Sequence, residues 1–242
     1  MEKKIIIYDF DGTLTPYPMP KFEILKKCGI ENYATNSMLK SAVKQKMEEE
    51  HINSCEAIYN LYFETIKNAG YELKNENFSL GAESVEYNPG VIKFLSHLNE
   101  NGIDNYIVSS GIKPYLEHVK IVTEKLINDI YATEFCYDEN NIVNGIKYLM
   151  TDVRKVEAIK DIIKNSDLKD CSNVIYVGDG LTDYYAFEYV HNNGGKAIYL
   201  YQNDKDTNID IMRKKGIIDL FCKPDYTLES KLSEYIKKEC NI

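Results

Sequence analysis

The sequence lacks the cysteine patterns that mark zinc sites and disulfide-rich secreted folds. It holds 6 cysteines, none in a Cys-x-x-Cys pair, and no histidine accompanies them at metal-binding spacing. They are scattered along the chain at Cys28, Cys55, Cys136, Cys171, Cys222 and Cys240. We therefore expect reduced thiols and a cytoplasmic protein.

Long apolar runs and excess positive charge are also missing. No stretch approaches the roughly 20 apolar residues of a membrane-spanning helix, and Asp9 interrupts the apolar run from Ile5 before it could act as a signal peptide. The 29 Lys and Arg face 38 Asp and Glu, for a formal net charge of -9. Nucleic acid needs basic patches that displace its counterions. We expect neither a membrane nor nucleic acid as a partner, and the oligomeric state is not predicted.

The sequence does contain an alternation of buried strands and helices. Residues 5–8 form a continuous apolar run, as parallel strands buried on both faces do. Further strands are predicted at 104–111, 131–136, within 173–183 and at 196–201, with a hairpin over 137–148. The intervening helices begin with Asn88 as N-cap before Pro89, at Pro114 and near Asp152. This order predicts an α/β fold with a doubly wound, Rossmann-like parallel sheet.

A helical segment interrupts the alternation after the first strand. The proline-rich stretch 16–20 cannot continue the sheet. Apolar residues then recur at helical spacing, for example Leu39, Val43 and Met47. We predict a small all-helical cap, residues 16–86, inserted into a core of residues 1–15 and 87–242.

Acidic and hydroxyl side chains follow the predicted strands: Asp9 and Asp11 after the first, Ser109 and Ser110 with Gly111 after the second, and Asp179 with Asp183 after the fourth. Each alone is typical of a turn or a helix entry, but parallel strands share one carboxyl edge, where ligands bind. Crowded carboxylates weaken a fold unless a cation compensates them, and Mg2+ prefers oxygen ligands. The N-H groups of Ser110 and Gly111 precede a helix and suit an anion. Together these features indicate phosphoryl transfer.

The segments "DFDGTLT", "IVSSG" and "GDGLTD", with a lysine at a helix start, resemble the four motifs of the haloacid dehalogenase-like hydrolases. Most members are magnesium-dependent phosphatases, and the overall pattern is similar to the phosphoserine phosphatase branch. The resemblance covers residues 1–15 and 87 to about 201, and the helical insert occupies the position of the first-type cap.

The resemblance implies a role for each matching residue. Asp9 is the expected nucleophile and Asp11 the acid/base. Asp179 is expected to bind Mg2+ with Asp9 and the Asp11 carbonyl, while Asp183 supports the metal. Ser109 is expected to donate to a phosphoryl oxygen, in a phosphate site with Thr13, Ser110 and Gly111.

The basic motif has more than one candidate. Lys155, at the start of the helix before the fourth strand, matches it best, and its ammonium would neutralise Asp9 and the transferring phosphoryl group. Arg154 is the second candidate and Lys147 the third.

The chemistry and the substrate leave alternatives open. Asp11 favours phosphate esters over haloacids, because halide leaves without a proton. A phosphotransferase or mutase, a phosphonatase with a cap lysine, and a non-catalytic metal-binding or protein-binding module remain alternatives. The expected partner is a small phosphorylated metabolite.

Residues near the start of the insert are candidates for substrate contact. Pro18 stands where the phosphoserine phosphatase branch has a glutamate for the substrate amine, which favours a less polar or an anionic leaving group. Tyr17, Met19 and Phe22 are the predicted contacts there, and phosphoserine is expected to be a poor substrate.

Overall fold

The computed structural model describes residues 3–17, 36–79, 82, 85–123, 126–204 and 206–242. In these residues the chain builds a 7-stranded sheet of order β4-β3-β2-β1-β5-β6-β7. Only the β3–β4 pair is antiparallel, and the other neighbours are parallel. The strands are β1 (Ile5–Tyr8), β2 (Asp104–Ile112), β3 (Asp129–Tyr137), β4 (Val143–Tyr148), β5 (Val174–Gly178), β6 (Lys196–Leu200) and β7 (Leu220–Cys222).

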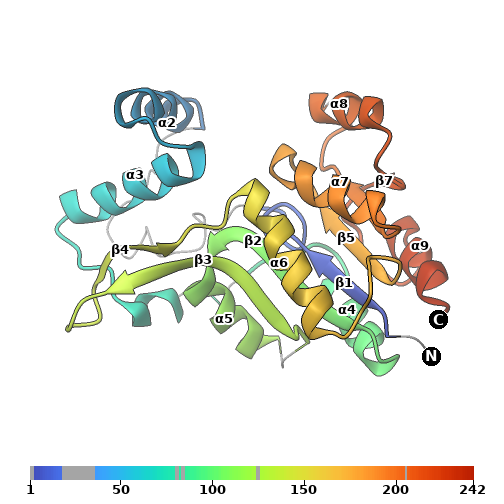
Figure 1. Ribbon diagram of the computed structural model, residues 1–242. Coiled ribbons are helices and arrows are strands. Elements are labelled where there is room, and N and C mark those ends of the chain that lie inside the picture. The colour runs from blue at the N-terminus through green and yellow to red at the C-terminus, as the bar shows by residue number, and fades with distance from the viewer. Residues whose placement is uncertain (1–2, 18–35, 80–81, 83–84, 124–125, 205) are drawn as a thin grey trace.

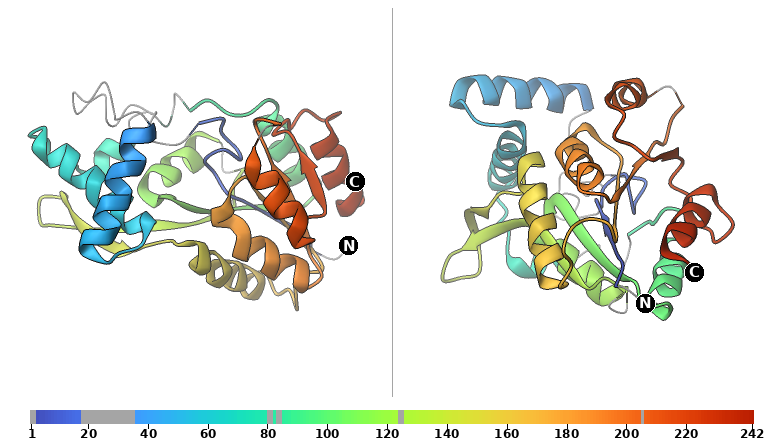
Figure 2. Two further views of the ribbon diagram at one scale, coloured as in Figure 1. Left: turned by 90° about the horizontal axis from the view of Figure 1, so that it is seen from above. Right: turned by 45° about the vertical axis from the view of Figure 1, so that its right-hand side comes forward.

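Helices cover both faces of the sheet (Figures 1 and 2). One face packs against α4 (Val91–Glu100), α5 (Lys113–Val122) and α9 (Lys231–Cys240), and the other against α6 (Asp152–Asn165), α7 (Tyr184–Asn192) and α8 (Thr207–Lys215). Along β1, Ile6 and Tyr8 enter the first hydrophobic cluster, and Ile5 and Ile7 enter the second. A strand that is buried on both sides is apolar throughout, so the predicted doubly wound α/β fold is confirmed.

The position of β1 in the middle of the sheet determines where the candidate site lies. Ile5 pairs with Asp104 of β2 on one side and with Val174 of β5 on the other. The chain visits β2 and β3 first, and crosses to β5 only later, through α6. Such a reversal of strand order leaves a crevice at the carboxyl ends of the central strands, which is where open α/β sheets bind ligands.

The helices inserted after β1 form a cap over one end of the sheet (Figure 1). In the described residues they are α2 (Asn36–Glu50) and α3 (Ser54–Asn68), followed by the short helix η2 (Asn75–Ser79). The β3–β4 hairpin supports the cap, because the ring of Phe135 lies 5.1 Å from that of Phe63, centroid to centroid, and Val143 N donates to Leu73 O at 2.8 Å. The boundary at residues 16–86 stays a proposal.

The first helix after the cap begins later than predicted. Helix α4 starts at Val91 with Gly90 as N-cap, in the left-handed conformation at φ 80°. The expectation that Asn88 caps this helix is therefore wrong. Asn88 instead binds the loop after β1, because its backbone N donates to Leu14 O at 2.9 Å and its Nδ2 to Thr13 O at 2.8 Å. No described helix is long and apolar enough to cross a membrane.

Candidate active site

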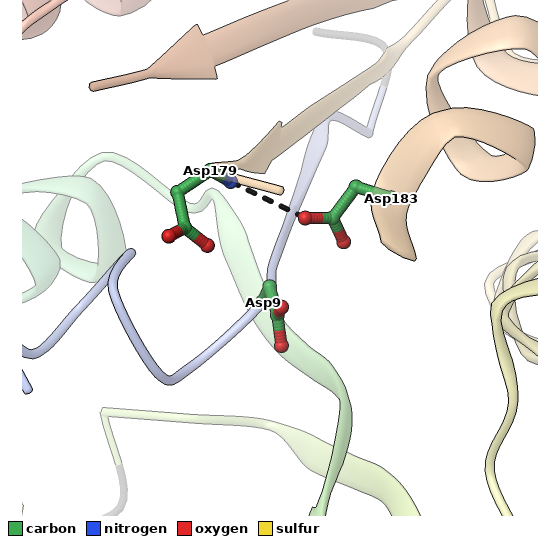
Figure 3. Close-up of side chains that lie close together, drawn as sticks. All are labelled: Asp9, Asp179 and Asp183. Carbon is green, nitrogen blue, oxygen red and sulfur yellow. Dashed lines mark hydrogen bonds between the residues drawn. The ribbon is translucent and has the colours of Figure 1, made fainter. Parts of the chain in front are cut away.

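Three aspartates converge at the carboxyl edge of the sheet (Figure 3). Asp9 follows β1, Asp179 follows β5, and Asp183 ends the short helix η4 (Leu181–Asp183). Each offers a carboxylate oxygen, and these oxygens lie within 4.8 Å of one another. The Asp9 backbone is held by its neighbour strand, since its N donates to Val177 O at 2.9 Å. The sheet itself therefore brings Asp9 next to two acidic residues that lie 170 or more positions later in the sequence.

Lys155 provides the cation beside this cluster. Its Nζ lies 3.0 Å from Asp9 Oδ2 and 2.6 Å from Asp183 Oδ1, and its side chain is fully buried. Burial alone would lower the pKa of Lys155, but the charges of Asp183 and Asp9 outweigh it and raise the pKa. The lysine stays protonated throughout the physiological pH range and neutralises part of the acidic charge.

The two other basic candidates point elsewhere. Arg154 is exposed, donates from Nη1 to Leu149 O at 2.9 Å, and stacks its guanidinium over the Tyr148 ring. Lys147 pairs with Glu134 at 2.9 Å. Of the three residues, Lys155 is the one that contacts Asp9.

Asp183 is a buried hub of hydrogen bonds. Its Oδ2 accepts from the backbone N of Asp179 at 3.2 Å and of Gly180 at 3.1 Å, and its Oδ1 accepts from Tyr176 Oη at 2.6 Å in addition to Lys155. Gly178 makes this approach possible, because a Cβ there would lie 2.6 Å from the Asp183 carboxylate. With both oxygens occupied, Asp183 shapes the loop that carries Asp179.

Sequence reasoning missed Tyr176 as a partner in this hub. It lies inside the apolar run of β5 and is fully buried. A buried tyrosine hydroxyl normally finds a hydrogen-bond partner, so a tyrosine two residues before a Gly-Asp-Gly turn was the available signal.

Asp179 packs against the turn that follows β1. Burial raises its pKa to about 8, and the neighbouring charges of Asp183 and Asp9 contribute. Gly12, at φ 81°, packs so tightly that a Cβ would lie 2.1 Å from Asp179 Oδ2. The Thr13 hydroxyl, predicted to bind phosphate, is fully buried and donates to Asp179 Oδ1 at 3.4 Å.

Asp11 lies in the same turn, outside the carboxylate cluster. Its carboxylate is not among the grouped oxygens of the described residues, and its backbone pairs with Thr15 in an isolated bridge. The Thr15 hydroxyl donates to Phe10 O at 3.3 Å and to Tyr17 O at 2.9 Å, which holds the turn closed. The turn therefore leaves the Asp9 carboxylate in the cluster with Asp179 and Asp183, and the Asp11 carboxylate outside it.

The end of β2 carries Ser109 and Ser110, the hydroxyl residues predicted to bind phosphate. Ser109 is buried, and its Oγ accepts from Gly111 N at 3.1 Å, so the serine hydrogen is not used in this contact. The Gly111 N-H expected in the anion cradle thus points at Ser109. The Ser110 carbonyl accepts from Thr133 Oγ1 at 3.1 Å and from the cap residue Tyr59 at 2.6 Å. Sequence reasoning did not identify Tyr59.

Of the predicted cap contacts, Tyr17 is 42% exposed. Met19 and Phe22 lie outside the described residues.

The donor set suits a hard divalent cation. Three carboxylates face the single buried ammonium of Lys155, and burial raises the pKa of Asp9 even though Lys155 opposes it. Buried acidic charge without compensation is unfavourable, and oxygen ligands of this kind are those that Mg2+ and similar ions prefer. The carboxylates of Asp9, Asp179 and Asp183 are the candidate ligands for such an ion.

Comparison with known proteins assigns the chain to a family. The model of haloacid dehalogenase-like hydrolases matches residues 6–188. The chain belongs to this family. An uncharacterized protein of Borreliella burgdorferi is 24% identical to this hydrolase, in a match that covers 97% of this chain and 95% of that protein.

Solved structures show the same fold over nearly the whole chain. A substrate-bound phosphoserine phosphatase complex has a TM-score of 0.66 at 18% identity, covering 98% of this hydrolase and 99% of that chain. Cytosolic 5'-nucleotidase IIIB bound to cytidine has a TM-score of 0.62 at 14% identity, covering 98% and 86%. The helical cap after β1 of this hydrolase is thus shared with the phosphoserine phosphatases.

Proposed function

We propose that this protein is a Mg2+-dependent phosphatase that hydrolyses a small phosphomonoester through an aspartyl-phosphate on Asp9. The observation that carries the proposal is the contact of Asp9 with the buried Lys155, at 3.0 Å, at the edge where Asp179 also lies. A carboxylate beside a fixed cation is stabilised in its ionised, nucleophilic form. Solved phosphoserine phosphatases of the same fold, among them a phospho-aspartyl intermediate analogue, support the assignment.

In the first step a carboxylate oxygen of Asp9 attacks phosphorus, and the bond from phosphorus to the leaving-group oxygen breaks. Asp11, in the turn after β1, donates its proton to that oxygen, so the product leaves as an alcohol. The ammonium of Lys155 and the hydroxyl of Ser109 stabilise the charge of the transferring group.

In the second step water attacks phosphorus and the bond to Asp9 breaks. Asp11 accepts the proton of the water, which restores both carboxyl groups and releases inorganic phosphate. Asp9 and Asp179 would hold Mg2+, which when bound neutralises phosphoryl charge and orients the group for in-line attack. Asp183 holds the loop of Asp179 in place through the amides of Asp179 and Gly180.

The described cap argues against phosphonatase chemistry, which needs a neutral lysine for a Schiff base. The least exposed lysine among the described cap side chains is Lys46, and its Nζ lies 2.7 Å from both Glu50 and Glu64. Hydrogen bonds to these two glutamates raise the pKa of Lys46. A protonated lysine cannot attack a carbonyl, so Lys46 is not suited to that step.

The test is Asp9→Asn, measured as phosphate release from p-nitrophenyl phosphate with and without Mg2+. Because an amide keeps the shape but cannot attack phosphorus, kcat should fall by at least about a thousandfold, close to 4 kcal/mol in barrier. Asp138→Asn is the matched control, since Asp138 makes only local turn contacts in the hairpin. Substantial turnover in a folded Asp9→Asn protein, or full activity in excess chelator, would contradict the proposal.

A further inference from the structure

Two segments that lie far apart in the sequence hold the carbonyl of Thr13, in the turn that carries Asp11. The first follows the cap, where Asn88 Nδ2 donates to Thr13 O at 2.8 Å. The second lies between β7 and α9, where Tyr226 Oη donates to the same oxygen at 3.2 Å. Thr13, Asn88 and Tyr226 are all buried, so water is not available to replace either donor. Burial also raises the pKa of Tyr226, which keeps its hydroxyl protonated and able to donate.

The two segments also bind each other. The backbone N of Tyr226 donates to Pro89 O at 2.7 Å. Gly90, at φ 80°, approaches the second segment so closely that a Cβ would lie 2.4 Å from Thr227 N. The Tyr226 ring packs on that of Phe94 in α4, with centroids 5.9 Å apart. This packing fixes the Tyr226 hydroxyl relative to the sheet.

The turn after β1 is wound tightly around one oxygen. The backbone N-H groups of residues 13–15 all donate to Phe10 O, at 2.9 to 3.2 Å. Asp11 lies within this winding, and the Thr13 hydroxyl donates to Asp179 Oδ1 at 3.4 Å. Because the turn is so short and so closely bonded, a shift of the Thr13 carbonyl moves Asp11 as well.

The proposed role of Asp11 makes it sensitive to such a shift. A general acid must come within about 2.6–3.2 Å of the oxygen that it protonates. The need for the proton depends on the leaving group. Phenolate is a strong base and leaves more easily when it is protonated, whereas p-nitrophenolate is stable as an anion and needs little protonation. A misplaced acid therefore slows phenyl phosphate more than p-nitrophenyl phosphate.

From this geometry we infer that Asn88 and Tyr226 are positioning residues, which act through Thr13 O and hold Asp11 in place for proton transfer to the leaving group. Tyr226 lies beyond residues 6–188, the part of the chain that the family model matches. The segment between β7 and α9 thus serves catalysis without carrying any of the family motifs. This inference rests on the proposed function and adds a support for its acid.

The test is Tyr226→Phe, measured as kcat/KM for phenyl phosphate and for p-nitrophenyl phosphate at saturating Mg2+. The variant keeps the ring and removes one hydrogen bond. General acid catalysis contributes about a hundredfold to ten-thousandfold, of which a partly misplaced acid loses a fraction. We expect kcat/KM to fall by about five- to tenfold for phenyl phosphate and by less than about twofold for p-nitrophenyl phosphate.

Tyr8→Phe is the matched control. Tyr8 is also fully buried, and its ring lies 6.4 Å from that of Tyr226, centroid to centroid. Its Oη donates to Asn105 Oδ1 at 3.2 Å, away from the turn. Tyr8→Phe should therefore leave the ratio of kcat/KM for the two esters unchanged, even if it lowers stability as much as Tyr226→Phe does.

A second variant reaches the same carbonyl from the other segment. Asn88→Ala removes the donor at 2.8 Å from Thr13 O and should lower the same ratio. The inference would be overturned by an unchanged ratio in the folded variants, whether both esters lose activity or neither does. An equal change of the ratio in Tyr8→Phe would overturn it too. Each of these results leaves the phosphatase assignment intact, whereas absence of Asp9-dependent hydrolysis of p-nitrophenyl phosphate would overturn the proposed function, and the inference with it.

Discussion

Replacing Lys155 by methionine should destabilise the protein far more than removal of a surface charge. Methionine keeps most of the apolar stem but leaves Asp9 and Asp183 without the ammonium that lies 3.0 and 2.6 Å from them. The lysine is fully buried and so is the Asp183 side chain. Breaking a buried ion pair from one side typically costs about 3–5 kcal/mol, because the remaining charge is uncompensated. We expect Lys155→Met to lose stability in this range.

The measurement is urea unfolding in the presence of chelator, so that no divalent cation replaces the ammonium. The chain has no tryptophan and 20 tyrosines, so circular dichroism and tyrosine fluorescence are the suitable probes. With a slope of about 2–3 kcal/mol per molar urea, the loss corresponds to a midpoint shift of about 1–2.5 M. Lys147→Met is the control, because Lys147 is 66% exposed in its pair with Glu134 and should contribute less than about 1 kcal/mol.

The pH dependence of the deficit provides a second check. Burial already raises the pKa of Asp9, and Lys155 opposes the rise, so its removal raises that pKa further. A carboxyl group whose folded pKa lies above its unfolded value destabilises the fold once it ionises, and protonation relieves this as pH falls. The stability gap between Lys155→Met and the parent protein should therefore narrow from pH 8 to pH 5. A shift no larger than that of Lys147→Met, or a gap that widens in acid, would refute the reasoning.

Further predictions concern the metal cluster. Asp179→Ala should raise the Mg2+ concentration for half-maximal activity more than Asp183→Ala does. Asp183→Ala should lower the urea midpoint more, because the buried Asp183 carboxylate accepts four hydrogen bonds. The Mg2+ concentration for half-maximal activity should fall as pH rises through about 8, the value to which burial raises the pKa of Asp179. The reason is that protons compete with the metal for the carboxylate. A Mg2+ concentration for half-maximal activity that does not change between about pH 6.5 and 9 would contradict this. Gly12→Ala should reduce kcat/KM by about tenfold or more without a comparable loss in secondary structure. The new Cβ would lie 2.1 Å from Asp179 Oδ2, and the backbone φ of 81° is unfavourable for alanine. A variant with unchanged kcat/KM would show that the turn can relax.

The local pattern of the sequence was sufficient for strands β1 to β6 of the sheet and for the acidic cluster. An apolar run followed by aspartate identified β1 and Asp9, and the Gly-Asp-Gly turn identified the end of β5. Because parallel strands share one carboxyl edge, strand order alone brought these ends together. Strand β7 and helices α8 and α9 were not predicted. Strand β7 is very short and α8 is largely polar, so both give a weak pattern. Helix α9 does carry a helical pattern, because Leu232, Ile236 and Cys240 are buried at four-residue spacing, and sequence reasoning overlooked it.

Tertiary structure decided which side chains serve the site. Lys155 and Arg154 are adjacent in the sequence, and only the rotation of α6 against the sheet turns one toward Asp9 and the other toward Leu149. Tyr176 and Tyr59 gain their partners from a loop and a strand end that lie 7 and 51 positions away. Local sequence sets periodicity and turn chemistry, because these depend on neighbouring residues. Contacts such as that of Tyr59 with Ser110 depend on how whole elements pack against one another, and the packing is determined by the complete core.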